Sequence, residues 1–210
     1  EALATADAYV NFNWAAENFN ITDGLETDPA GVMIQTPEWI QVGDNYHVPY
    51  KWGGFNTLDE FSSGLLENKF AGDRITDCSQ NYCVSNYCIG VDCSGFVSRC
   101  WNLSTHYSTA MMDDDITIAY ETWDDLNPGD AIHKVGHVRM VVFKNNDGSI
   151  LTVEASGYDW KVSYRSYNLS QLTAYSPRYY QGMEGTAGSI PIPKLSSVIK
   201  EDEIILNWRL

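Results

Sequence analysis

The stretch HVRMVVFKNNDGSILTVEAS, residues 137–156, restricts the possible folds more than any other part of the sequence. It holds two mainly apolar runs on either side of Asn-Asp-Gly, a combination typical of two antiparallel strands joined by a tight turn. A further run, WKVSYRSY at 160–167, predicts a third strand. Because these strands follow one another without helices between them, the sequence predicts an antiparallel sheet and an α+β fold rather than alternating βα units.

Helices are predicted at two places before these strands. Residues 2–19 are rich in alanine and repeat apolar side chains at helical spacing. A second helix is predicted from Cys93, because Cys93, Phe96, Val97 and Cys100 fall on one helical face. This apolar face is expected to pack on the antiparallel sheet.

The length of 210 residues fits one domain with additions. We expect the domain to span residues 1–180 and a C-terminal extension to span 181–210, packed on the same domain. The extension contains a predicted strand pair around KEDE. Residues 56–92 form a long polar connection, and a connection of that length inside a compact domain is usually functional or cross-linked.

Charge excludes several classes of partner. The chain has 13 Lys and Arg against 28 Asp and Glu, a net charge of −15. Such a surface repels phosphate backbones, so neither nucleic acid nor an anionic membrane is an expected partner. No run approaches the ~18–20 apolar residues that span a bilayer, so no membrane span is predicted.

Five cysteines lie within one short region, at positions 78, 83, 88, 93 and 100. Clustered cysteines together with few lysines favour an oxidising, extracytoplasmic location. An odd number leaves at least one thiol free in a monomer, the expected oligomeric state, and spacing does not fix which cysteines pair. Cys100 is expected in the core. The five-residue rhythm does not match zinc-ligand spacing, so no metal site is predicted.

Cys93 is a candidate nucleophile. A thiol attacks as its thiolate, and the N–H groups and dipole of a helix N-terminus favour that negative charge. The sequence DCSG therefore predicts a Cys93 thiol with a lowered pKa, next to N–H groups able to face an oxyanion. The alternative, on spacing alone, is that Cys93 forms a disulfide with Cys88 or Cys83.

His137 and Glu154 are the candidate base and orienting carboxylate. They are 17 residues apart, so any even-length loop in the predicted hairpin places both side chains on one face of the sheet. A carboxylate beside an imidazole fixes its tautomer and stabilises its charged form. Two alternatives stay open: His137 caps a strand, and Glu154 pairs with Arg139, which a four-residue loop would place directly opposite.

Several motifs occur in an order that resembles the NlpC-type cell-wall cysteine peptidases, a papain-like family. They are PYKWGG at 49–54, DCSGFV at 92–97, LNPGDAI at 126–132, GHVRMVV at 136–142 and VEASG at 153–157. The resemblance covers roughly residues 40–160. It implies a papain-like fold and a cysteine peptidase that hydrolyses peptide bonds in peptidoglycan stem peptides, next to D-glutamyl, without a cofactor.

Individual positions follow from the resemblance. Cys93 matches the nucleophile, His137 the base, and Glu154 the third polar residue, where the family commonly has His. The resemblance further implies that Tyr50 lies near the oxyanion and that Asp92 and Ser94 help to bind the ammonium of a substrate N-terminus.

Two further departures from the family pattern affect the cleft. The segment between WGG and DCSG is usually short, so residues 56–91 are interpreted as an insertion that holds Cys78, Cys83 and Cys88 and one disulfide. It is either a lid over the cleft or a cross-linked surface decoration. Arg139 stands where relatives usually have Gly, and either binds a substrate carboxylate or forms an ordinary ion pair.

Two alternative functions remain. One is a related amidase or acyltransferase that uses the same residues on a substrate other than peptidoglycan. The other is an inactive module that binds cell-wall fragments. The state of Cys93 discriminates them from a peptidase, because only a free and reactive thiol supports an enzyme. His47, His106 and His133 are interpreted as structural, with His47 also possible at the rim of the cleft.

Overall fold

A computed structural model of the chain describes residues 1–76, 84–183, 194–200 and 203–209. Its largest element is a six-stranded sheet in the order β11-β10-β9-β8-β12-β7, in which every neighbouring pair is antiparallel. The α+β prediction is therefore confirmed. The strands are β7 (Thr117–Ala119), β8 (Ala131–Lys134), β9 (His137–Lys144), β10 (Ile150–Ser156), β11 (Lys161–Tyr167) and β12 (Ser176–Tyr180).

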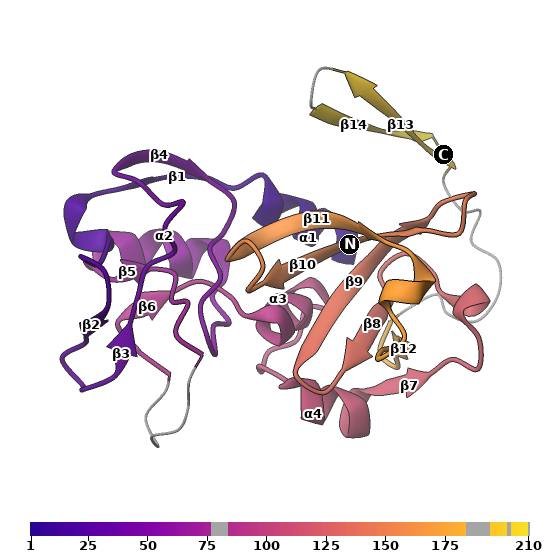
Figure 1. The fold of residues 1–210 in the computed structure, drawn as a ribbon, viewed down its shortest axis with the longest axis horizontal. Helices are drawn as coiled ribbons and strands as arrows, with labels where there is room; N and C mark the ends of the chain where they lie inside the picture. The colour runs from indigo at the N-terminus through magenta and orange to yellow at the C-terminus, as the bar shows by residue number, and fades with distance from the viewer. Residues whose placement is uncertain (77–83, 184–193, 201–202, 210) are drawn as a thin grey trace.

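The predicted hairpin and the predicted third strand are both present in this sheet. β9 pairs with β10 across a turn of residues 145–149, and β10 pairs with β11 along its whole length. β10 is buried at every position, because one face packs on helix α3 and the other lies over a second, smaller cluster of apolar side chains. This sheet occupies the right-hand half of the molecule in Figure 1.

The first helix ends earlier than predicted. α1 (Ala2–Val10) is followed by β1 (Asn13–Ala16), which pairs with β4 (Gly43–Tyr46), so the prediction of a helix through residue 19 is wrong. Trp14 explains the change, because its indole packs edge-on against Phe61 and donates a hydrogen bond of 2.8 Å to the carbonyl oxygen of His47. These long-range contacts outweigh the local helical preference of the alanines.

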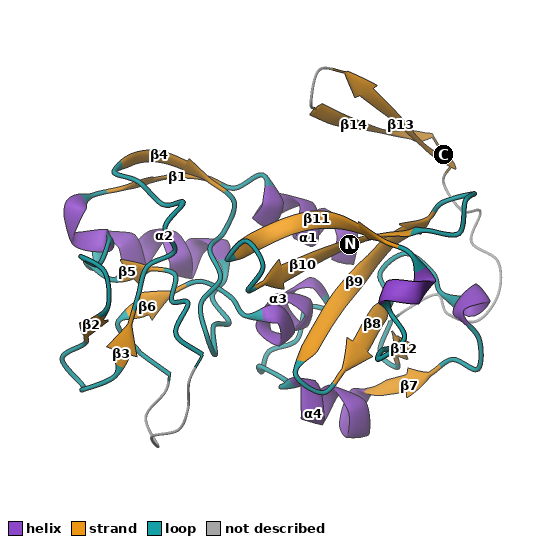
Figure 2. Cartoon of the chain, in the orientation of Figure 1, coloured by secondary structure: helices purple, strands orange, loops and turns teal. Residues whose placement is uncertain are grey.

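The described parts of the segment 56–91, residues 56–76 and 84–91, hold regular structure rather than only a polar loop. It contains α2 (Leu58–Leu66), β5 (Phe70–Ala71) and β6 (Cys88–Ile89), the last two paired in parallel. α2 begins with a capping box in which Thr57 and Glu60 bond to each other's backbone N–H groups. With β1, β4, β2 (Glu26–Thr27) and β3 (Met33–Ile34), these elements lie in the left-hand half of the molecule in Figure 2.

Helix α3 (Cys93–Cys100) connects the two halves. Phe96 and Val97 are fully buried, and the helix packs against β9 and β10, as the sequence predicted. One continuous core passes through it, from Phe61 of α2 to Val138 of β9. α3 therefore fixes the position of its own first turn relative to the sheet.

Gly95 lets α3 approach the chain before it. A Cβ at this position would lie 1.9 Å from the carbonyl oxygen of Gly54, which in turn accepts a hydrogen bond of 3.0 Å from the Asp92 N–H. A backbone oxygen held in this way has no room to move. Only glycine fits, although glycine is otherwise unfavourable inside a helix.

We expect Gly95→Ala to destabilise the protein by at least about 3 kcal/mol, because overpacking here displaces backbone rather than a flexible side chain. Urea unfolding followed by tryptophan fluorescence measures the change. Ser63→Ala, on the exposed face of α2, is the control and is expected to change stability by less than about 0.5 kcal/mol. An equally stable Gly95→Ala protein would contradict the close approach.

The remaining elements lie at the edges of the molecule. α4 (Thr109–Met111) precedes β7, and β13 (Lys194–Lys200) pairs with β14 (Glu203–Arg209) as an antiparallel hairpin, which confirms the predicted strand pair. That residues 181–210 pack on the domain stays a prediction. Within the described part of the chain, no helix has the length and apolar character needed to cross a membrane.

Candidate active site

Cys93 is the first residue of α3, and Asp92 is its N-cap. The Asp92 carboxylate accepts a hydrogen bond of 2.6 Å from the Gly95 N–H, which fixes the start of the helix at the predicted place. Cys93, Cys88 and Cys100 are all free and buried. The alternative that Cys93 pairs with Cys88 is therefore wrong, and Cys78 and Cys83 lie outside the described residues.

The pKa of Cys93 differs from the prediction. It is raised to about 12, mainly by burial and in part by the charge of Asp92, although the N–H groups of Val138, Ser94 and Cys93 itself act to lower it. The sequence predicted a lowered value because it revealed the helix N-terminus but not the depth of burial. The resting Cys93 is a protonated thiol, so it needs a base to attack a carbonyl.

His137 and Glu154 share one face of the sheet through a β-bulge. The five-residue turn 145–149 would by itself place them on opposite faces, but the pairing shifts at Leu151/Thr152 and Val142 is left as an extra residue on β9. Beyond the bulge Val153 pairs with Met140, so Arg139 follows opposite Glu154 and His137 lies two residues further along the same face. The bulge thus restores the register that a four-residue loop would have given.

Glu154 binds both of the residues proposed as its partners. Its Oε2 atom lies 2.6 Å from His137 Nε2 and accepts a hydrogen bond of 3.2 Å from Arg139 Nε. The other oxygen, Oε1, accepts a hydrogen bond of 2.6 Å from the Tyr167 hydroxyl. Burial acts to raise the pKa of Glu154, but the His137 hydrogen bond and the Arg139 charge outweigh it and hold the pKa below its ordinary value. The carboxylate is fully buried and ionised.

Arg139 is held between two tyrosines that sequence analysis did not identify. Its guanidinium carbon lies 4.2 Å from the ring centroid of Tyr167 and 4.3 Å from that of Tyr175. Tyr175 also accepts a hydrogen bond of 3.2 Å from Arg139 and approaches the His137 ring edge-on. The tyrosines carry no distinguishing pattern in the sequence, because their contacts depend on how β11 and the chain before β12 meet β9.

The thiol and the imidazole lie at the same end of the sheet. The Cys93 sulfur is within reach of the backbone N–H of Val138, the residue after His137. No hydrogen bond joins the sulfur to the imidazole in the described structure. Because Nε2 of His137 is bound to Glu154, Nδ1 is the nitrogen left to face a thiol. Such nucleophile–base contacts are often long without substrate and tighten in the complex.

Tyr50 is close enough to Cys93 and Asp92 for their charges to act on its phenol, while its place near an oxyanion stays a prediction. Burial raises the pKa of the Tyr50 phenol, and the nearby charges of Cys93 and Asp92 raise it further. Its backbone is held by a parallel bridge to Val91 and by a hydrogen bond of 2.9 Å to Trp160, whose ring it contacts edge-on. The phenol is therefore neutral and able to donate a hydrogen bond.

Asp92 and Ser94 form a cluster with His106. The Ser94 hydroxyl lies 2.9 Å from Asp92 Oδ1 and 3.0 Å from His106 Nε2, which is itself 3.3 Å from the same carboxylate oxygen. His106 stacks on Phe55. His106, which the sequence analysis interpreted as structural, is thus part of the polar cluster formed by the residues on either side of Cys93, and no sequence motif marks it. Its structural role stays a prediction.

Comparisons with known proteins add no assignment: no family model, no curated protein and no solved structure matches this chain. Among the residues with described positions, no group of three or more His, Cys, Asp or Glu side chains is arranged to hold a metal ion. The site is therefore interpreted from its own residues.

Proposed function

We propose that this protein is a cysteine hydrolase that cleaves a peptide or amide bond through an acyl-enzyme on Cys93, with a papain-like, NlpC-type arrangement of its active site. The observation that carries the proposal is the 2.6 Å contact between His137 Nε2 and the buried, ionised Glu154, beside the first turn of the helix that begins at Cys93. An imidazole oriented by a carboxylate next to a free thiol is the arrangement that acyl transfer requires.

Because the pKa of Cys93 is raised, the first step must remove the thiol proton. Nδ1 of His137 takes the thiol proton as the sulfur attacks the carbonyl carbon, and Glu154 stabilises the imidazolium that forms. The N–H groups of Cys93 and Ser94 and the hydroxyl of Tyr50 are the donors nearest to the developing oxyanion. His137 then gives the proton to the departing amine. Water, deprotonated by the same imidazole, hydrolyses the thioester and frees Cys93.

The substrate class rests on the sequence resemblance. It is a peptidoglycan stem peptide cleaved next to D-glutamyl, which places the protein outside the cytoplasm. The Asp92 carboxylate, beside Cys93 and hydrogen-bonded to Ser94, supports this assignment as a partner for the ammonium of a stem that begins with a free amine. A related amidase on another substrate would use the same residues.

Purified peptidoglycan sacculi test the substrate class. We expect the wild-type protein to release peptides with a new D-glutamyl carboxyl group, detected by mass spectrometry. Cys93→Ala is expected to release none above background, since it lacks the thiol that forms the proposed thioester. If Cys93→Ala is as active as wild type, the acyl-enzyme proposal is wrong. If neither protein releases peptides but wild type forms a thioester with model amides, only the peptidoglycan assignment fails.

The second candidate, an inactive module that binds wall fragments, is favoured by one observation. Burial keeps the Cys93 thiol protonated at neutral pH. If that candidate is correct, wild type and Cys93→Ala bind sacculi equally in a sedimentation assay, and Cys93 reacts with iodoacetamide no faster than the core residue Cys100.

A further inference from the structure

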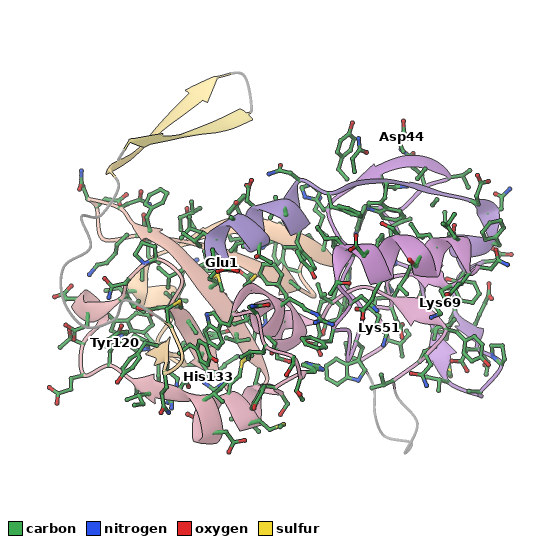
Figure 3. The ribbon with its side chains drawn as sticks, turned by 180° about the vertical axis from the view of Figure 1, so that it is seen from behind. Glu1, Asp44, Lys51, Lys69, Tyr120 and His133 are labelled. Atoms are coloured by element: carbon green, nitrogen blue, oxygen red, sulfur yellow. The ribbon has the colours of Figure 1, made fainter. Side chains whose placement is uncertain are left out.

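A second site lies in the other half of the molecule. A cavity of about 370 Å³ opens between α2, β6 and the chain at residues 51–56. It is lined by neither Cys93 nor His137. Its charged lining residues are Lys51, Lys69, Arg99 and Glu60, three cations against one anion. Figure 3 labels Lys51 and Lys69, which lie in the same half of the molecule below α2.

Lys51 is the exceptional residue of this cavity. It is only 5% exposed, yet no hydrogen bond or ion pair joins its ammonium group to any residue in the described part of the chain. Asp73 is paired with Lys51 through the backbone. Its Oδ1 atom accepts the N–H groups of Gln35 and Ile75, and its Oδ2 atom is buried without a hydrogen-bond partner, so Asp73 forms no direct contact with the ammonium. Burial lowers the pKa of Lys51, and the nearby Cys88, Asp73 and Asp92 offset only part of this effect.

The other two cations have only weak partners of their own. Lys69 lies 3.1 Å from Glu67, and both side chains are at least a third exposed. Arg99 lies 3.3 Å from Glu60, whose side chain is more than half exposed. Its Nε also donates a hydrogen bond of 2.8 Å to the carbonyl oxygen of Phe55, and its guanidinium covers the Phe55 ring. Exposed ion pairs of this kind contribute little, so both charges remain available to a ligand.

The three cations of this cavity are unusual because the chain as a whole is strongly acidic. A protein with a net charge of −15 repels anions over most of its surface. Three cations around one concave site, with a buried ammonium at its base, reverse that potential locally. A buried charge is normally paired, and the missing partner here is an anion. The cavity volume is in the range of small-molecule sites.

We propose that the cavity beside Lys51 binds a small oxyanion, the carboxylate or phosphate of a low-molecular-weight ligand, with Lys51 as its main charge partner and Lys69 and Arg99 at its sides. Asn56 and Asn86 supply further polar groups on the wall. This site is independent of the chemistry at Cys93, because no residue of the proposed catalytic set lines it.

Thermal shift and calorimetric titration with sodium phosphate and with sodium succinate test the proposal, at an ionic strength held constant with sodium chloride. We expect saturable binding of at least one of the two anions to wild type and an affinity at least tenfold weaker in Lys51→Met, which keeps the apolar stem. Lys144→Met, which removes a lysine outside the cavity, is the control and is expected to bind as wild type does.

A second variant covers the case in which Lys51→Met does not fold. Lys69→Met removes an exposed cation at the same cavity and is expected to weaken binding two- to tenfold without loss of folding. Preference for phosphate or for succinate distinguishes a phosphorylated ligand from an organic acid. The proposal is overturned if neither anion saturates wild type, or if both cavity variants bind as tightly as Lys144→Met.

Discussion

Replacement of His137 by alanine is expected to slow the reaction of Cys93 with iodoacetamide at pH 7 by a factor of about 10²–10⁴. The reason is the raised pKa of the buried thiol. With a pKa of about 12, a thiol without a base is ionised in roughly one molecule in 10⁵ at pH 7. In the proposed mechanism, His137 of the wild type takes the proton as the sulfur reacts. Peptide mapping by mass spectrometry measures the rate at Cys93 alone.

Two comparisons make this result specific to the imidazole. Val135→Ala changes an exposed residue in the turn just before β9 and is expected to leave the Cys93 rate unchanged. Cys100 is buried and free, so its labelling rate in the same samples reports any opening of the core. Equal Cys93 rates in wild type and His137→Ala, with Cys100 unreactive in both, would show that the two residues do not act together.

The sheet was largely predictable because its signal is local. Apolar strands around Asn-Asp-Gly identified β9 and β10, and the apolar face from Cys93 to Cys100 identified α3. The bulge at Val142 was not predictable, because it lies within the run Met140 to Phe143, where no polar residue marks the extra position. Glu154 was therefore predicted on the correct face of the sheet, but from a four-residue loop instead of the five-residue turn and bulge that the structure contains.

Only those residues of the candidate site that belong to recognisable sequence motifs could be predicted. Cys93, His137 and Glu154 were identified, and the latter two are in contact. The pKa of Cys93 was predicted in the wrong direction. The sequence pattern indicates where a helix begins, but it does not indicate how deeply Cys93 is buried. Tyr167 and His106 were missed for a similar reason: each reaches the site from an element whose approach is decided by tertiary packing.

Glu154→Gln is expected to reduce hydrolysis on the order of 10³-fold or more, because a neutral amide neither fixes the useful imidazole tautomer nor stabilises the imidazolium. It is also expected to lower stability at pH 7 by about 3–5 kcal/mol, since it leaves the buried Arg139 guanidinium without its counter-ion. Urea unfolding measures the second effect and steady-state release of amine from a model amide the first.

The stability difference between wild type and Glu154→Gln is expected to decrease on acidification. The pKa of Glu154 is lowered in the folded protein, so its stabilising contribution is present above the ordinary value of 4.5 and is lost as pH falls through the folded pKa. We therefore expect a constant difference between pH 5 and 7 that shrinks below pH 4.5. A difference that grows on acidification would mean that Glu154 is protonated in the native state.

The double variant Arg139→Met with Glu154→Gln separates the two roles of the carboxylate. Arg139 and His137 bind the same oxygen of Glu154, so one anion serves a buried cation and the imidazole that we propose to be catalytic. Removing the guanidinium as well removes the unpaired charge, and most of the lost stability is expected to return. Hydrolysis is expected to stay as low as in Glu154→Gln, because His137 still lacks its carboxylate. If activity returns together with stability, Glu154 acts on the fold alone and His137 needs no orienting anion.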